Sequence, residues 1–398
     1  MNKRCLSKIL LSLLFFIVAP SVFALAPVAR IVYIEGAVFL QRDGDTLNLQ
    51  DSDIGIELFA YDFIETGDDG FVEVELVGYS RRGTILKVEK CSAFYFNDIE
   101  RNGSAKTTVQ MMAGTISFRV QKLAENEALN VQTETALMGV RGTDFIVKRA
   151  PDGSVLVVCV EGKVACEDDR HMERYAMPGS IVEKRPGSPL SRVDIDVGDE
   201  NLYELYWSGK REEVFRAGAE SFTRGYSSQY NSYLPRFLSA YEALLSVKRQ
   251  LENSDRESNE LSKLITVKAD TTDEVIMMCN ILPLFEHSFY AVQVLEKYYE
   301  QGEIQSLKLD RHYTSDDFFN DFMRRKDEIK NKLADIRYCM KLYDNISHSA
   351  SVETDSRFSP AVEPLEKSDL PLSELDPKTD SFNTRQDLPD LRPDGIDF

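Results

Sequence analysis

The sequence predicts a multidomain protein with two kinds of structure: an N-terminal all-β part, solenoid- or sandwich-like, followed by an α-helical bundle. Short β-type runs separated by glycine and aspartate turns fill the first part, and the apolar spacing then changes from two residues to about 3.6. A loop rich in proline and glycine separates the two patterns. We therefore expect a signal peptide at 1–24, an all-β domain at 25–190, an α-helical domain at 191–349 and a disordered acidic tail at 350–398.

The N-terminus has the pattern of a secretory signal. Three basic residues precede an apolar run at 9–19, and Val22-Phe23-Ala24 places small or aliphatic residues where a signal peptidase reads them. The run is shorter than the roughly 20 residues of a membrane-spanning helix, which disfavours a retained anchor. The sequence predicts cleavage before Leu25, a periplasmic or exported location, and no later membrane-spanning segment.

The charge and the cysteines narrow the class of protein further. The net charge of -19 becomes -22 once the three positive charges of the signal are removed, and such a surface repels nucleic acid and anionic lipid. Five cysteines remain, too few and too scattered for a disulfide scaffold. Cys159 and Cys166 flank the turn at 161–163 of an expected hairpin. A turn centred on Glu161-Gly162 leaves them diagonal and unbridged, which we favour, whereas one centred on Gly162-Lys163 would place them opposite each other.

Within the β part, Phe71 to Leu76 alternates clearly. This spacing predicts a strand with Val72, Val74 and Leu76 on one face. Turn signals about every 8 to 12 residues are typical of a sandwich, barrel or solenoid.

The helical part contains stripes of apolar residues at helical spacing. A capping box at 271–274 predicts the start of a helix that ends at Gly302, and a second long helix is expected after Ser315. Pro235 suits the first turn of an earlier helix. Twelve of the 17 tyrosines fall between residues 203 and 343. We interpret them as core and rim residues, with a carbohydrate or peptide groove as the alternative.

The stretch "TETALMGVRGTDFIV" is the most distinctive part of the sequence. Gly142 permits a backbone angle or close approach that a Cβ forbids, and Thr143 can bond to nearby backbone. Arg141 offers a fork of donors to carbonyls or a carboxylate. These three residues suit a β-arch between two sheet layers. The alternative is a ligand site in which Arg141 and Thr143 hold one carboxylate.

From about residue 31 to 183 the chain resembles the FecR-type domain, a periplasmic module of ferric-citrate-type regulators. The resemblance is carried by Thr133, Thr135, Arg141, Gly142, Thr143, Phe145 and, in the phrase "VEGKV", Gly162. It implies a β fold and a periplasmic compartment. The regulators of that family carry a cytoplasmic anti-sigma segment and a membrane span before the β domain, and we find neither pattern here. Control of a sigma factor across a membrane therefore does not carry over.

No catalytic, cofactor-binding or metal-binding residues are indicated, because the four histidines are isolated and without credible partners and no nucleophile or phosphate-loop motif is present. We expect a non-catalytic envelope protein whose β module binds or scaffolds a protein or cell-wall component. The alternative is a periplasmic sensory protein that contacts an outer-membrane receptor. Self-association through the helical domain is a further expectation.

Overall fold

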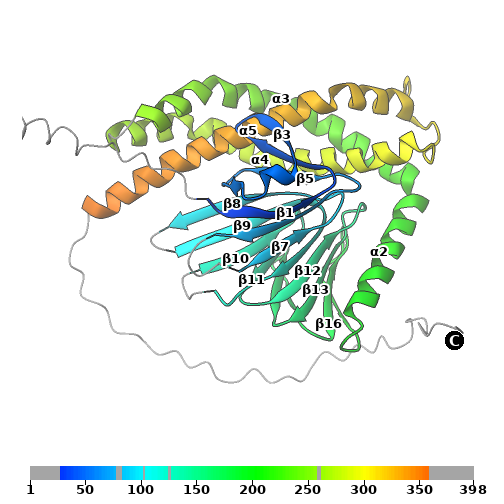
Figure 1. Cartoon of the computed structure of the whole chain (residues 1–398). Helices are drawn as coiled ribbons and strands as arrows, with labels where there is room; N and C mark the ends of the chain where they lie inside the picture. The colour runs from blue at the N-terminus through cyan, green and yellow to red at the C-terminus, as the bar shows by residue number, and fades with distance from the viewer. Residues whose placement is uncertain (1–26, 78–82, 102–103, 124–126, 258–260, 358–398) are drawn as a thin grey trace, which may run out of the picture. The chain divides into compact units, whose positions relative to one another are not determined.

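The structure is a computed structural model that describes residues 27–77, 83–101, 104–123, 127–257 and 261–357. The strands and helices up to Asp355 belong to one compact unit. The strands come first along the chain and the helices follow, which confirms the predicted fold class (Figure 1). The expected signal peptide at 1–24 and residues 358–398 of the expected tail lie outside the described residues. The first residues of that tail, 350–357, are helical rather than disordered.

The β part consists of short strands joined by turns. They are β1 (Ala29–Glu35), β2 (Val38–Arg42), β3 (Asp45–Leu49), β4 (Glu57–Leu58), β5 (Phe63–Thr66), β6 (Phe71–Leu76), β7 (Ile85–Val88), β8 (Ala93–Arg101), β9 (Ser104–Arg119), β10 (Glu127–Gln132), β11 (Ala136–Val140), β12 (Asp144–Arg149), β13 (Val155–Glu161), β14 (Val164–Asp168), β15 (Glu173–Ala176), β16 (Ser180–Lys184) and β17 (Ser191–Asp194).

These strands form two layers that share the long strand β9. Layer A has the order β4-β1-β6-β7-β9-β12-β13-β16-β17. Layer B has the order β3-β2-β5-β8-β9-β10-β11-β14-β15. The first part of β9 pairs in layer B up to Ala113, and the part from Gly114 onward pairs in layer A. In both layers the strands follow one another nearly in chain order, because the chain repeatedly crosses from one layer to the other.

Several crossings between the layers contain a glycine with positive φ. Gly36, Gly55, Gly142, Gly162 and Gly179 lie in connections between strands, and Gly114 lies within β9 where that strand passes from layer B to layer A. Glycine suits such turns because a residue with a Cβ pays a steric cost at positive φ. The Arg141–Thr143 segment joins β11 in layer B to β12 in layer A, as the β-arch interpretation predicts.

The expected hairpin around Gly162 is wrong. β13 pairs with β12 and β16, whereas β14 pairs with β11 and β15, so the turn is another arch between layers. Cys159 therefore lies opposite Phe145, and Cys166 opposite Met138. The positive φ of Gly162 serves an arch as well as a hairpin, and the local sequence does not distinguish the two.

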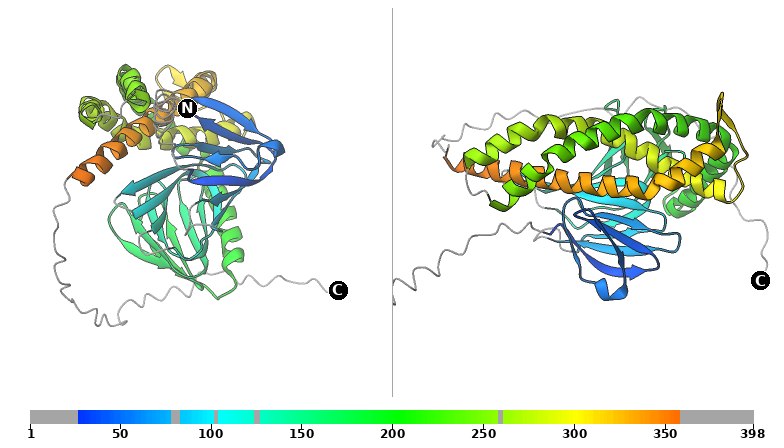
Figure 2. Two further views of the ribbon diagram at one scale, coloured as in Figure 1. Left: turned by 60° about the vertical axis from the view of Figure 1, so that its left-hand side comes forward. Right: turned by 90° about the horizontal axis from the view of Figure 1, so that it is seen from above.

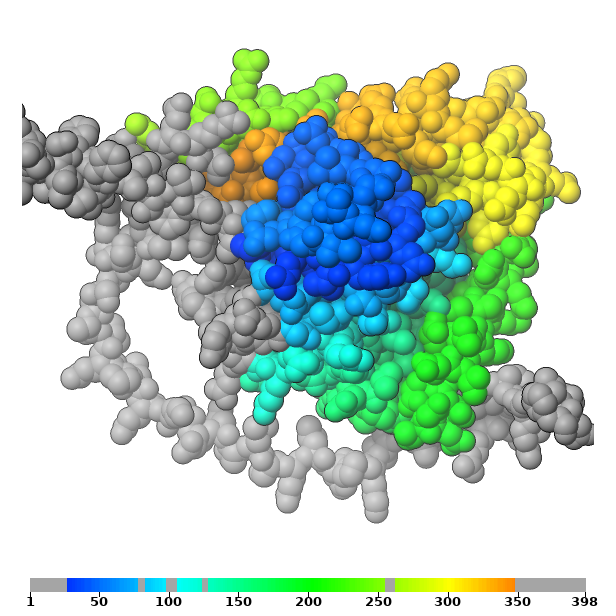
Figure 3. All heavy atoms as spheres, in the orientation of Figure 1, coloured from blue at the N-terminus to red at the C-terminus, as the bar shows by residue number. Residues whose placement is uncertain are grey.

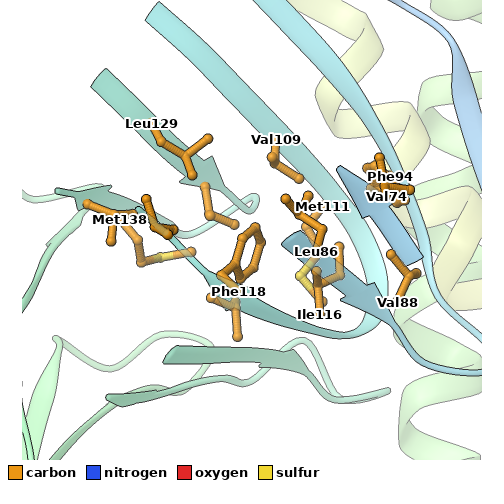
Figure 4. Close-up of a cluster of buried hydrophobic side chains, with 14 of the residues drawn as sticks. Val74, Leu86, Val88, Phe94, Val109, Met111, Ile116, Phe118, Leu129 and Met138 are labelled. Carbon is orange, nitrogen blue, oxygen red and sulfur yellow. The ribbon is translucent and has the colours of Figure 1, made fainter. Parts of the chain in front are cut away.

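The space between the layers is filled by apolar side chains. In Figure 4 residues of layer B such as Val109, Met111 and Leu129 lie near Ile116 and Phe118 of layer A. Val72, Val74 and Leu76 are buried, as their alternation predicts.

Four helices follow within the described residues: α2 (Glu200–Ala217), α3 (Ala219–Glu257), α4 (Leu261–Glu300) and α5 (Ser315–Arg357). The start of α5 at Ser315 and the end of α4 before Gly302 agree with the helix bounds expected from the sequence. The other two starts differ. Thr271 and Thr272 lie inside α4, where each hydroxyl donates to the carbonyl four residues earlier instead of capping an end. Pro235 lies inside α3, because the chain is already helical from Ala219.

Helices pack on the outer faces of both layers. Phe63 of β5 and Ala93 of β8 are buried in the same cluster as residues of α3, α4 and α5. Trp207 of α2 is buried against Leu156 and Val158 of β13. Figure 2 shows α3, α4 and α5 side by side, and Figure 3 shows the first strands at the surface beside α5. The two parts of the chain thus share an extensive interface.

Candidate functional site

Three backbone segments lie side by side at the edge of the β part where β9 and β13 end and β12 begins. The amide of Val120 donates to the carbonyl of Thr143 at 2.9 Å. A Cβ on Gly142 would lie 3.2 Å from Cα of Lys122, and one on Gly162 would lie 3.0 Å from the carbonyl oxygen of Gly142. We call the segments 120–122, 141–143 and 161–163 the arch edge. Their close stacking depends on the two glycines.

The arch edge holds Arg141, Gly142, Thr143 and Gly162 of the predicted motif. Arg141 is exposed and has no hydrogen bond or ion pair with the described residues. Thr143 is 3% exposed, and its Oγ1 has no partner within the described part of the chain. Because one side chain points to solvent and the other is buried, they do not form the carboxylate clamp that the sequence left open.

The remaining motif residues lie elsewhere. Thr133 and Thr135 are at the other end of β11, where Thr133 Oγ1 accepts a hydrogen bond from the amide of Ala136 at 3.1 Å. Phe145 stacks on Phe118 in the core, with ring centroids 4.6 Å apart. These positions are those of a turn and of a core residue.

A polar cluster joins the motif segment to the helices. Nδ1 of His287 in α4 lies 2.5 Å from Oε2 of Glu134 and 2.5 Å from Nη2 of Arg149. Arg149 also donates to the carbonyl of Met112 at 2.6 Å, and burial lowers its pKa. His287 thus has charged partners, contrary to the expectation that the histidines are isolated. The partners are far away in sequence and no local pattern reveals them.

A second histidine also has a partner. Nδ1 of His171 lies 2.6 Å from Oε1 of Glu167, and this hydrogen bond raises the pKa of the exposed imidazole. The pair lies at a surface turn.

A second polar cluster lies deep in the interface between β2 and the helices. Arg337 of α5 donates to Glu286 of α4 at 2.9 Å and to Gln41 of β2 at 2.5 Å, and its guanidinium lies 4.1 Å from the ring centroid of Phe63. Burial raises the pKa of Glu286 to about 7, although Arg337 opposes the shift. No pattern in the sequence indicates this cluster, since its members come from distant segments of the chain.

Two hollows lie in the described surface, one polar and one apolar. A cavity of about 10 Å³, room for roughly one water, is lined by Gln41, Tyr61 and Arg337. An apolar groove of about 360 Å³ lies between α3 and α4 beside Pro235, Met277 and Ile281. Among the described residues no group of three or more His, Cys, Asp or Glu is arranged to hold a metal ion.

Tyrosines of the helical part mainly fill its core. Tyr226, Tyr230 and Tyr290 are buried in the cluster that also contains Phe285 and Phe289. Their placement fits the interpretation as core residues.

One described helix is apolar enough, by length and composition, to cross a membrane. It is the part Ser262–Glu300 of α4, and 61% of its most apolar stretch is buried within the protein. This corrects the expectation that no later segment has such a composition. A core helix meets the same criterion, and α4 carries two buried glutamates paired with cations, Glu286 with Arg337 and Glu296 with Lys326.

Part of the β region matches the sequence model of a known protein family. The sequence model of the family described as "FecR protein" matches residues 62–165. The match spans β5 to the first residues of β14 and includes the whole arch edge. The chain therefore carries a FecR-like domain in this segment, as the motif residues indicate.

Solved structures provide a more distant likeness. Two crystal structures of a "putative anti-sigma factor" from Parabacteroides distasonis ATCC 8503 align with this chain at 19% and 20% identity, with TM-scores of 0.30 and 0.29. The alignments cover 35% and 34% of this chain, and 63% and 60% of those chains. This chain thus spans less than two thirds of either of them. Among curated proteins, no sequence matches this chain.

Proposed function

We propose that this chain is a non-catalytic regulatory protein of the cell envelope, in which the FecR-like β part binds another protein. The observation that carries the proposal is the exposure of the arch edge. β12 runs from this edge to Arg149, whose guanidinium contacts His287 of α4. The helices therefore cover the other end of β12 and leave the turn of the motif, with Arg141, exposed.

The FecR match favours the sensory and regulatory interpretation over a purely scaffolding role. It supports binding to a protein such as an outer-membrane receptor more than binding to a cell-wall polymer. The cell-envelope location rests on the signal-like N-terminus. Fractionation should find the protein outside the inner membrane with Leu25 as its first residue, whereas an intact Met1 terminus in the inner membrane would contradict this location.

Crosslinking in the native host tests the function. The full-length protein, tagged at its C-terminus, is crosslinked in intact cells, purified and analysed by mass spectrometry. We expect one protein partner in amounts comparable to the tagged chain, and a deletion strain in which transcription of a restricted set of genes changes. Recovery of no partner, or hydrolysis of glycan, peptide or ester substrates by the purified protein above a heat-killed control, would count against the proposal.

Scaffolding through self-association is the second candidate function. It is supported by the apolar groove between α3 and α4, beside which Ile276 is 51% and Met277 48% exposed. Sedimentation equilibrium of the purified protein should then show a dimer that Met277→Lys disrupts. A monomer at all concentrations would exclude this candidate.

A further inference from the structure

Each of the three stacked segments of the arch edge contributes one exposed cation. Lys122 follows the end of β9, Arg141 precedes β12, and Lys163 follows β13. β9, β12 and β13 are neighbours in layer A, where adjacent strands lie about 4.8 Å apart. The backbones of the three residues therefore lie in a row that spans about 10 Å by the strand spacing.

None of the three cations has an ion pair with the described residues, and Nζ of Lys163 lies 3.5 Å from the ring centroid of Tyr175. Of the acidic residues near this edge, Asp144 is held by Arg119 at 3.4 Å, Glu173 hydrogen-bonds Tyr175, and Glu161 is exposed. A positive row is unusual on a chain with a net charge of -19.

An apolar side chain lies next to the row. The pairing of β12 with β13 skips Val160, because Asp144 is opposite Glu161 and Phe145 is opposite Cys159. This bulge turns Val160 outward, so that it is 52% exposed. β-bulges commonly re-aim a side chain near a functional site. The bulge is an observation independent of the charges, and it lies at the same edge of the β part.

We propose that the arch edge docks a short, extended, acidic segment of a partner polypeptide. Carboxylates of the segment pair with Lys122, Arg141 and Lys163, and an apolar side chain of the segment packs on Val160. An extended chain advances about 3.3 Å per residue, so three or four residues span the row. This inference rests on the protein-binding function proposed above and names the surface and the chemistry of its partner.

A polypeptide fits this edge better than a uniform polyanion does. A long nucleic acid or polyphosphate would be repelled by the net negative charge of the whole chain. A short acidic segment would interact mainly with the three cations of the arch edge. Val160 and the ring of Tyr175 also offer apolar contacts that a polyphosphate cannot use.

A binding assay with purified full-length protein tests the proposal. The probe is a fluorescein-labelled octapeptide in which glutamate alternates with serine and valine, and the matched probe has lysine in place of glutamate. The edge variant combines Lys122→Glu, Arg141→Glu and Lys163→Glu. The control variant combines Arg249→Glu, Lys308→Glu and Arg311→Glu, which are exposed positions on α3, on β18 (Lys308–Asp310) and just after it. Both variants have the same net charge.

We expect the acidic probe, and not the lysine probe, to bind, with an affinity that falls as salt is raised. The edge variant should lower the affinity at least about tenfold, which corresponds to about 1.4 kcal/mol. The control variant should change it less than about threefold, as expected for charges remote from the site. Val160→Ser should weaken binding without changing its salt dependence. Thermal unfolding of each variant confirms that the exposed substitutions leave the fold intact.

Equal losses in the two variants would overturn the proposal, because they would show a response to net charge alone. Binding of polyphosphate as tight as that of the acidic probe would overturn the assignment to a polypeptide. The crosslinking experiment separates this inference from the proposed function. If the edge variant still captures the cellular partner, the function stands and the docking surface is wrong; if the wild-type protein captures none, the function itself fails.

Discussion

Gly142 lies where two arches of the β part approach closely, and its φ of +71° is in the left-handed region. A methyl group there meets the backbone of Lys122 as well as an unfavourable backbone angle. The glycine therefore serves the stacking of the arches, while Arg141 beside it supplies the exposed charge. The motif thus combines a structural residue and a residue available for binding.

Replacing Gly142 by alanine should lower the free energy of unfolding by about 1–2 kcal/mol, because the substitution adds left-handed strain and a contact at 3.2 Å. Chemical denaturation measures the change. Gly209→Ala is a matched control, since Gly209 is inside α2 with nothing within 4 Å of an added Cβ. It should raise the free energy of unfolding by up to about 1 kcal/mol. Similar effects of both substitutions would refute the role assigned to Gly142.

Glu286 makes the stability depend on pH. Its pKa is raised from 4.5 to about 7 by burial, so the folded protein binds this proton more tightly than the unfolded chain does. The contribution to stability is fully present below about pH 4.5 and is lost as pH rises through about 7. Glu286→Gln keeps a hydrogen-bond acceptor for Arg337 and removes the titration. The difference in unfolding free energy between variant and wild type should therefore increase from pH 4.5 to 7, by at most about 3 kcal/mol. A constant difference over this range would contradict the assignment.

Features that depend on neighbouring residues can be predicted from the sequence. Arg141, Gly142 and Thr143 predict a glycine turn at this point, because φ and turn chemistry are local. Glu134 and His287 come together only through the packing of α4 on the β part. No spacing in the sequence encodes that contact.

At the scale of elements, the turn around Gly162 also depends on contacts that are distant in sequence. The two strands and the glycine turn between them are predicted correctly. The local sequence does not specify whether the second strand pairs with the first or crosses to the other layer. The predicted helix starts are wrong for a related reason. Thr271 and Thr272 have the sequence of a helix cap, yet α4 continues through them. Their hydroxyls donate to backbone carbonyls one turn earlier, and Leu264, in the preceding part of α4, is buried.

The arch leaves Cys159 and Cys166 as separate buried thiols. Burial raises their pKa values to about 11 and about 12, so both stay protonated and unreactive in the folded protein. Alkylation of the native protein should label the exposed Cys91 and Cys279 first. After unfolding without reductant, Cys159, Cys166 and Cys339 should all become labelled. A linked Cys159 to Cys166 peptide in the mass map would contradict the free thiols.

At the scale of the whole molecule, the interface between strands and helices is rich in charge. Lys330 of α5 donates to both carboxylate oxygens of Glu65 in β5, at 2.9 and 2.8 Å, and Lys341 lies 2.9 Å from Asp43. The core cluster between the two strand layers contains no residue of the helices, whereas the cluster of α3, α4 and α5 includes Phe63 and Ala93 of the β part. We propose that the segments 25–190 and 191–349 are separable domains, although strand pairing extends to Asp194.

Limited proteolysis tests this proposal. A nonspecific protease should cut near Pro186 to Ser191, because residues 185–187 are exposed, and should remove the segment after about residue 349. The two fragments, separated in denaturant, should each refold with their own cooperative transition. Fragments that refold only when mixed would show that the strands and helices form one cooperative domain.

The central claim is that the arch edge of the FecR-like β part binds a partner protein, and site-specific photocrosslinking in the native host tests it most directly. A benzoylphenylalanine side chain is placed at Arg141 or Lys163 of the full-length chain, and at the exposed Arg249 on α3 as the control. We predict a crosslinked protein adduct from both edge positions and little from the control. An adduct from position 249 with none from positions 141 and 163 would contradict the claim.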